Sequence, residues 1–206
     1  MVPQYFLSAS GQPSPIMPPS YFTGKSVTSH VLVKSPASTF PGFIEEFTNP
    51  PVPLSITSAE YHAMGKKEKA NAKLVGYMVP CTFDRSPWEG RKIEHARACS
   101  SIILDVDDAD DARRFVEEPG LLIDALGKFN FAAYQTISST PASPRIRVIV
   151  EASEISVEKY PDAALTVGQI MGLPKVTRES AIVCQPQFRP TVFSDQCKDL
   201  ENPLLV

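Results

Sequence analysis

The sequence predicts an α+β fold with a mostly antiparallel sheet. Short runs rich in β-branched and apolar residues predict strands at residues 100–106, 131–136 and 145–152. Apolar residues at helical spacing predict helices at residues 110–129 and 156–172. Only a Ser/Pro turn at 138–144 separates the second and third strands, so we expect them to pair as a hairpin.

The first quarter of the chain differs in composition from the rest. Residues 1–53 hold ten of the 20 prolines and many Ser and Thr residues, which is typical of extended or partly disordered chain. Within it, residues 26–33 predict a strand and residues 40–47 a short helical turn. We therefore expect a Pro/Ser-rich segment at 1–53 and one folded domain at 54–206.

Capping and turn residues predict the next elements. Thr57 or Ser58 can cap a helix that runs to about residue 73, with Glu60 in its first turn and Gly65 as a break. The chain that follows predicts a strand at 76–83 and a loop at 84–90.

Stop signals define the ends of the later helices. Pro119-Gly120 interrupts the first helical pattern and predicts two pieces. Ser153 or Ser156 can cap the second helix, and Gly172 fits its C-terminal end. Residues 182–192 predict a strand pair.

Composition and charge narrow the class of protein. The content of hydrophobic (43%) and charged (21%) residues predicts a soluble globular protein. No membrane-length apolar run or signal-peptide pattern is present, so we expect a cytoplasmic protein. The four cysteines are scattered and form no C-x-x-C pair, and there are three histidines, a pattern that argues against a zinc site and predicts buried or free thiols.

The net charge of −3 lacks the large basic excess common in nucleic-acid-binding domains. A local basic cluster could still contact a nucleic-acid backbone, and the alternative for it is an ordinary solvated face. Its members are Lys73, Arg91, Lys92 and Arg97.

Asp105 and Asp107 form the most informative pattern in the sequence. They end the predicted strand at 100–106, and their spacing places both carboxylates on one face of the strand. Like charges held together repel each other, and carboxylate oxygens suit Mg²⁺ or Mn²⁺. The spacing therefore predicts a divalent-metal site, with an acidic, solvated strand end as the alternative.

Several motifs around this pair occur in a particular order over residues 54–193. They are Lys73-x-x-Gly76-Tyr77, Gly90-Arg91-Lys92, the Asp-x-Asp run at 98–107, the stretches 134–141 and 144–150, and Ser180 with 185–190. Together they resemble the primase-polymerase domains of the archaeo-eukaryotic primase superfamily, in the branch found in phages and plasmids.

The resemblance implies an RRM-like α+β core with a smaller α/β unit beside it. It also implies a DNA-replication protein that performs two-metal nucleotidyl transfer on a single-stranded DNA template, with Asp105 and Asp107 as Mg²⁺ or Mn²⁺ ligands. Arg145 and Arg147 lie on the strand facing that site and would bind the incoming nucleotide or the template.

The sequence departs from the family at two motifs. Ile137 and Ser139 occupy the positions of the family's histidines, and only Ser139 can donate a hydrogen bond to a phosphate. Thr177 occupies the position of the third carboxylate, for which Glu179 is the substitute.

Three functions remain open on the sequence. The first is an active, divergent primase-polymerase, and the second is a weakened primase-like module that binds nucleic acid or nucleotide. The third is a metal-dependent nuclease. No G-x-x-x-x-G-K-[ST] loop is present, so unwinding would fall to a separate replicative helicase or to a part of the gene product outside this chain.

Overall fold

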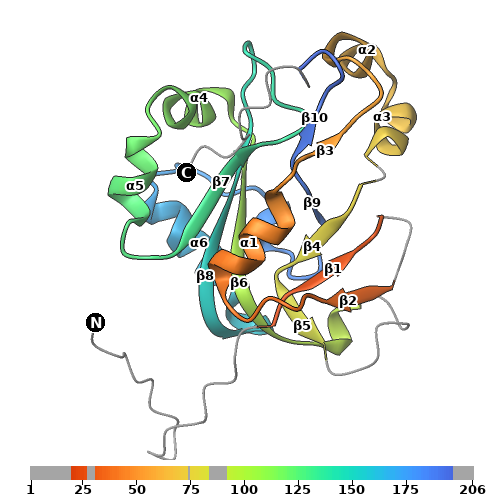
Figure 1. Cartoon of the computed structure of the whole chain (residues 1–206). Coiled ribbons are helices and arrows are strands. Elements are labelled where there is room, and N and C mark those ends of the chain that lie inside the picture. The colour runs from red at the N-terminus through yellow and green to blue at the C-terminus, as the bar shows by residue number, and fades with distance from the viewer. Residues whose placement is uncertain (1–19, 27–30, 74, 84–91, 197–206) are drawn as a thin grey trace, which may run out of the picture.

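The computed structural model describes residues 20–26, 31–73, 75–83 and 92–196 (Figure 1). The α-helices in these ranges are α1 (Phe40–Thr48), α2 (Ser58–Ala63), α3 (Lys66–Ala72), α4 (Ala109–Glu117), α5 (Gly120–Leu126) and α6 (Tyr160–Ile170). The strands are β1 (Phe22–Gly24), β2 (Leu32–Lys34), β3 (Val52–Pro53), β4 (Tyr77–Val79), β5 (Cys81–Phe83), β6 (Ala96–Val106), β7 (Phe131–Gln135), β8 (Ile146–Ser156), β9 (Gln187–Phe188) and β10 (Thr191–Val192). None of the helices described is long and apolar enough to cross a membrane.

Two four-stranded sheets and a strand pair form from these elements. The central sheet has the order β5-β6-β8-β7, and the second sheet has the order β2-β1-β4-β9. All neighbours in both sheets are antiparallel, whereas β3 and β10 form a parallel pair. The predicted α+β class with mostly antiparallel sheets is therefore confirmed.

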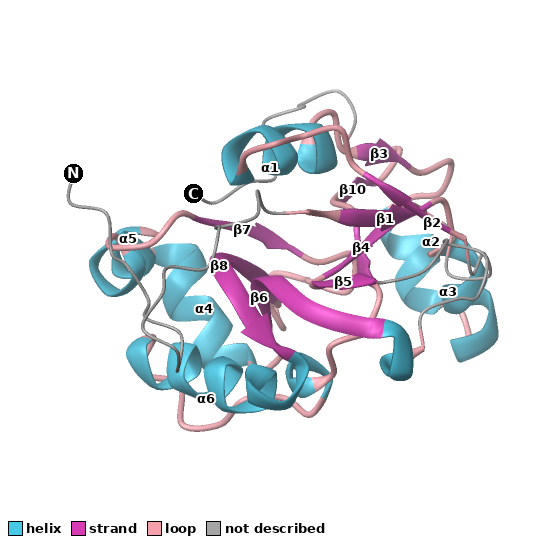
Figure 2. Cartoon of the chain, turned by 90° about the horizontal axis from the view of Figure 1, so that it is seen from below, coloured by secondary structure: helices cyan, strands magenta, loops and turns pink. Residues whose placement is uncertain are grey.

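The central sheet lies between two layers. Alternate residues of β6 and β8, such as Leu104 and Val148, are buried in the core cluster to which α4, α5 and α6 contribute. Their neighbours Ile103 and Ile149 belong to a second cluster, which contains the aromatic residues of α1. Figure 2 shows α1 on one side of the sheet and α4 and α6 on the other.

Helix α1 packs on the central sheet through aromatic rings. Phe43 is fully buried and stacks on Tyr21 at a centroid distance of 4.2 Å and on Phe47 at 5.7 Å. The Arg189 side chain, which follows β9, donates hydrogen bonds to the carbonyls of Phe47 and Glu46 at the end of α1. The described part of segment 1–53 thus packs on the core, while the boundary after residue 53 stays a prediction.

Most of the predicted helices form, with small changes at their ends. Thr57 and Glu60 make the expected capping box at α2, and Gly65 separates α2 from α3. Glu118 and Pro119 separate α4 from α5, as predicted. Gly172, at φ +68°, follows α6. Helix α6 begins later than expected because a 3₁₀ turn, Val157–Lys159, precedes it and β8 extends to Ser156.

Three strand predictions need correction. The single strand expected at 76–83 is two strands, because Pro80 lies between β4 and β5, which join different sheets. The segment 182–192 holds β9 and β10, but they pair with β4 and β3 and not with each other. The strand expected at 26–33 is displaced to β2, and residues 27–30 lie outside the described residues. The predicted loop at 84–90 also lies outside them.

The packing of α1 predicts a large cost for Phe43→Ala. We expect the free energy of unfolding to fall by about 3–5 kcal/mol, because the ring is fully buried and its removal leaves a cavity. Phe129→Ala removes a ring that is 44% exposed and should cost less than about 1 kcal/mol. Urea denaturation at equal m-values measures both, and equal losses would contradict the assigned packing.

Candidate functional site

A polar row crosses three adjacent strands of the central sheet. Asp105 of β6 lies opposite Arg147 of β8, and Arg147 lies opposite Tyr134 of β7. Opposed residues in antiparallel strands point to the same face, so the three side chains form one row on the α1 side of the sheet. This placement follows from the register and confirms that Asp105 and Arg147 share a face.

Asp105 and Arg147 form a nearly buried ion pair. Arg147 Nε donates to Asp105 Oδ1 at 2.7 Å, and the two side chains are 13% (Asp105) and 10% (Arg147) exposed. Burial alone lowers the pKa of Arg147, but the charge of Asp105 and the neighbouring Tyr134 outweigh it and raise that pKa above its usual range. Arg147 therefore stays charged, and Asp105 supplies the compensating charge.

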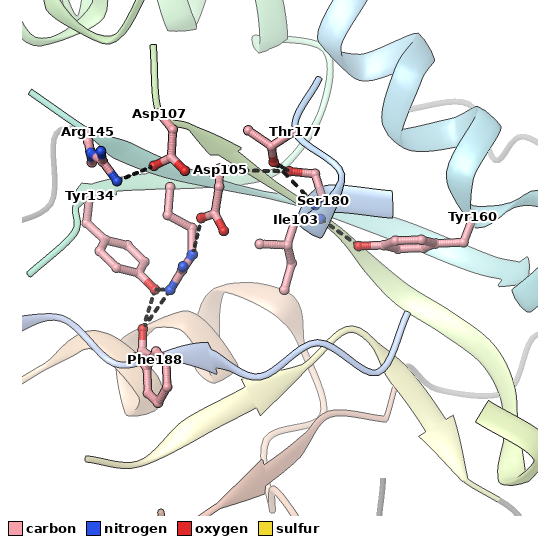
Figure 3. A network of polar contacts seen from close by, with 10 residues as sticks. Ile103, Asp105, Asp107, Tyr134, Arg145, Tyr160, Thr177, Ser180 and Phe188 are labelled. Atoms are coloured by element: carbon pink, nitrogen blue, oxygen red, sulfur yellow. Dashed lines mark hydrogen bonds and ion pairs between the residues drawn. The ribbon is translucent and has the colours of Figure 1, made fainter. Parts of the chain in front are cut away.

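The row is tied to the second sheet at Phe188 of β9. Tyr134 donates its hydroxyl proton to the Phe188 carbonyl at 2.6 Å, and Arg147 Nη1 donates to the same carbonyl at 3.2 Å. Figure 3 shows the Tyr134 ring pointing toward the Phe188 backbone. Two donors on one carbonyl fix β9 against the central sheet.

Asp107 and Arg145 form a second, more exposed ion pair on the same face, each two residues along the chain from Asp105 and Arg147. Their Oδ1 and Nη1 atoms are 3.5 Å apart, and their side chains are 47% and 40% exposed (Figure 3). Partial burial raises the pKa of Asp107, and the charges of Asp105 and Glu179 add to this, while Arg145 and Arg147 oppose it. Asp107 is thus the carboxylate of the site that is open to solvent.

Hydroxyl groups hold the β6 backbone beneath the two aspartates. Strand β5 pairs with β6 only at its beginning, opposite Ala96 and Cys99. Further along that edge, the N–H groups of Ile103 and Asp105 donate to the hydroxyls of Tyr160 (3.2 Å) and Ser180 (2.9 Å), as Figure 3 shows. These bonds satisfy backbone donors that a fifth strand would otherwise have taken, and so they fix the position of Asp105.

The two pairs open onto a cavity of about 170 Å³ between the sheets, here called the polar cavity. Its charged lining is Lys73, Asp105, Asp107, Arg145, Arg147 and Arg189. Lys73 Nζ also donates to Ser138 in the turn after β7, at 3.3 Å. Among the residues that the structure describes, four cationic side chains against two carboxylates give the lining a formal charge of +2, which favours an anionic ligand.

The structure brings together some of the predicted site residues and not others. Glu179 is exposed in the 3₁₀ turn Glu179–Ala181 and is not part of the cavity lining, although its charge reaches Asp107. Ser139 accepts the Arg145 backbone N–H at 3.0 Å and donates to Gln135, so it fixes the turn beside the cavity.

Of the described members of the predicted basic cluster, Lys73 is the one that lines the cavity. Lys92 is exposed and pairs with Glu94 at 3.6 Å, and Arg97 is an exposed residue of β6. Neither lines the polar cavity, and Arg91 lies outside the described residues. Across the described ranges, no group of three or more His, Cys, Asp or Glu side chains is arranged to hold a metal ion.

Sequence reasoning missed several residues of the site. Tyr134, Ser138 and Arg189 contact or line the cavity but were not singled out. Tyr134 has a usable signal, since it is a polar aromatic at the end of an apolar strand beside the Ser/Pro turn. Thr177 was noted only as a missing carboxylate, whereas it hydrogen-bonds Ser180 at 2.8 Å and supports β6 through it.

Comparison with known proteins gives no match: no family model, curated protein or solved structure resembles this chain at a significant level.

The two ion pairs predict losses of stability that differ greatly in size. Arg147→Met should lower the free energy of unfolding by about 3–5 kcal/mol, because it leaves Asp105 nearly buried without its partner. Arg145→Met, at the exposed pair, should cost less than about 1 kcal/mol. Urea denaturation measures both variants, and adding Asp105→Asn alone and Asp105→Asn combined with Arg147→Met completes a double-mutant cycle for the buried pair. Additive losses at Asp105 and Arg147 would show that the ion pair does not couple them.

The environment of Asp107 predicts a raised pKa that NMR titration can measure. The folded chain should hold this proton to a higher pH than the unfolded chain, whose Asp pKa is about 3.9. The contribution of Asp107 to the free energy of unfolding therefore falls as pH rises from that value through the folded-state pKa. Arg145→Met should raise the pKa further, because it removes the nearest opposing charge. A wild-type pKa at or below the ordinary value of about 3.9 would contradict this environment.

Proposed function

We propose that this chain is a primase-like replication protein of phage or plasmid type that binds a nucleoside triphosphate and a single-stranded DNA template at the polar cavity. The observation that carries the proposal is the shared face of Asp105, Asp107, Arg145 and Arg147, which places two carboxylates among basic side chains around one cavity. This combination suits a ligand whose phosphates are accompanied by a divalent cation.

The carboxylates fit Mg²⁺ or Mn²⁺. Magnesium is commonly held by one or two carboxylates together with substrate phosphates and water, which is the donor set that Asp105 and Asp107 could complete. When bound, the metal ions would neutralise the triphosphate and align the attacking 3′-oxygen with the α-phosphorus. Of the two, Asp107 is the more available ligand, since it is exposed and its Arg145 contact is long, at 3.5 Å.

The basic residues have distinct parts in this proposal. Arg145, 40% exposed, is free enough to turn toward a phosphate, and Lys73 approaches the cavity from the end of α3. Arg147 is held by Asp105, Tyr134 and Phe188, so it would shape the cavity and add positive charge without moving. The attack of the 3′-hydroxyl would form the new P–O bond and release pyrophosphate.

The strand order supports the RRM-like part of the proposal. Strand β6, helices α4 and α5, strands β7 and β8, and helix α6 follow one another, and β8 lies between β6 and β7. This β-α-β-β-α order with a central third strand is typical of split βαβ folds, to which the RRM sheet belongs. The sheet β2-β1-β4-β9, with α1 to α3, would be the smaller unit.

A second candidate is a primase-like module that binds nucleotide or template without synthesis. The ion pair between Asp105 and Arg147 favours it, because a metal ion would have to compete with Arg147 for Asp105. Ile137 in the cavity lining points the same way, since its side chain cannot donate a hydrogen bond to a triphosphate.

One assay tests these functions together. The chain is incubated with a single-stranded template, a primer, nucleotides and Mn²⁺ or Mg²⁺, with Asp107→Asn as the test variant. Asp110→Asn is the matched control, since it removes the same charge from an exposed residue of the neighbouring helix α4. We expect metal-dependent extension that Asp107→Asn abolishes and Asp110→Asn retains.

The remaining outcomes separate the alternatives. Template or nucleotide binding without extension supports the binding module, and template degradation supports a nuclease. A Mn²⁺-dependent rise in melting temperature should accompany either activity and weaken in Asp107→Asn. Absence of nucleotide and template binding under all conditions would contradict the proposal and its alternative.

A further inference from the structure

Three cysteines from distant parts of the chain meet at one end of the central sheet. Cys81 of β5 lies opposite Cys99 of β6, and both are fully buried. Cys184, which is partly exposed, approaches from the segment before β9, and its Sγ lies 3.8 Å from Cys81 Sγ. The thiols of residues 81 and 184 are thus in contact although 103 positions separate them.

The two contacting thiols differ in environment. A hydrogen bond with Cys184 and burial raise the pKa of Cys81 well above its usual range, so Cys81 rests as a thiol and must give up its proton as it reacts. Its Sγ also lies 3.1 Å from the Val183 carbonyl oxygen and donates to it. Cys184 is the partner that solvent can reach, and oxidants therefore meet it first.

We propose that Cys81 and Cys184 are a redox pair that closes to an intramolecular disulfide when the protein meets a peroxide. Cys184 sulfur attacks one peroxide oxygen, the O–O bond breaks, and a sulfenic acid and one water form. As the Cys81 thiol gives up its proton, its sulfur attacks the sulfur of residue 184; the S–S bond forms, the S–O bond of the sulfenic acid breaks, and the departing hydroxyl takes that proton as a second water. Overall, two thiols are oxidised to a disulfide and one hydrogen peroxide is reduced to two waters.

The disulfide would act on the segment that borders the polar cavity. Its bond length of about 2.05 Å is well below the present 3.8 Å separation, so closure brings the Cys184 sulfur closer to β5 and tethers the chain at residue 184 to that strand. Gln185, Pro186 and Phe188 follow directly and line the cavity, and the Phe188 carbonyl holds Tyr134 and Arg147. Oxidation at residue 184 therefore reaches the site through four residues of chain.

Peptide mapping by mass spectrometry tests the proposal without relying on any activity. The full chain is treated with hydrogen peroxide, remaining thiols are alkylated, and the digest is compared with and without a reductant. We expect a linked Cys81–Cys184 peptide pair that the reductant separates. Hydrogen exchange should slow over residues 183–188 in the oxidised chain, because the crosslink restrains this segment.

Serine variants identify the thiols that react. Cys184→Ser and Cys81→Ser should abolish the crosslink, and Cys184→Ser keeps the test valid if the buried Cys81→Ser variant fails to fold. Cys99→Ser is the matched control and should retain the crosslink. A crosslink through Cys99 or Cys197, or oxidation of Cys184 to a sulfinic acid without any crosslink, would overturn the proposal.

Discussion

The ion pair between Asp105 and Arg147 is the interaction on which the rest of the site depends. Removing two charges from water is costly, and the cost is offset only where the pair is well aligned and its other polar groups are satisfied. Here the Phe188 carbonyl and the Tyr134 hydroxyl supply the further contacts of Arg147. The pair and its further contacts therefore require three strands of the central sheet and one strand of the second sheet to meet at a single point.

That requirement explains the arrangement around the cavity. Because β9 must present the Phe188 carbonyl, the chain after α6 returns across the sheet, and on its way Ser180 occupies the open edge of β6. Arg189 follows Phe188 directly and donates to the carbonyls at the end of α1, so it joins that helix to β9. One short segment, residues 180–189, thereby holds the backbone of Asp105, the Arg147 side chain and the end of α1 in place.

The sequence could predict the helices and strands and which site residues share a face of one strand, but not which residues lie opposite each other on neighbouring strands. Periodicity located β6 and β8, and the alternation along each strand placed Asp105 with Asp107 and Arg145 with Arg147. The register that sets Asp105 opposite Arg147 depends on contacts across the sheet, which no local pattern contains. Pro80 was visible, yet its effect of sending β4 and β5 into different sheets follows from tertiary packing. The contact of Cys81 with Cys184 likewise joins distant segments and has no sequence signal.

We propose that the polar cavity holds a divalent cation with phosphate beside Asp107. Paramagnetic Mn²⁺ tests it directly, since bound Mn²⁺ broadens the NMR signals of nearby nuclei. In the presence of a nucleoside triphosphate, the account predicts that broadening at low Mn²⁺ concentration centres on Asp105, Asp107 and Arg145. Broadening centred instead on the exposed acidic residues of α4, or spread evenly over the surface, would contradict it.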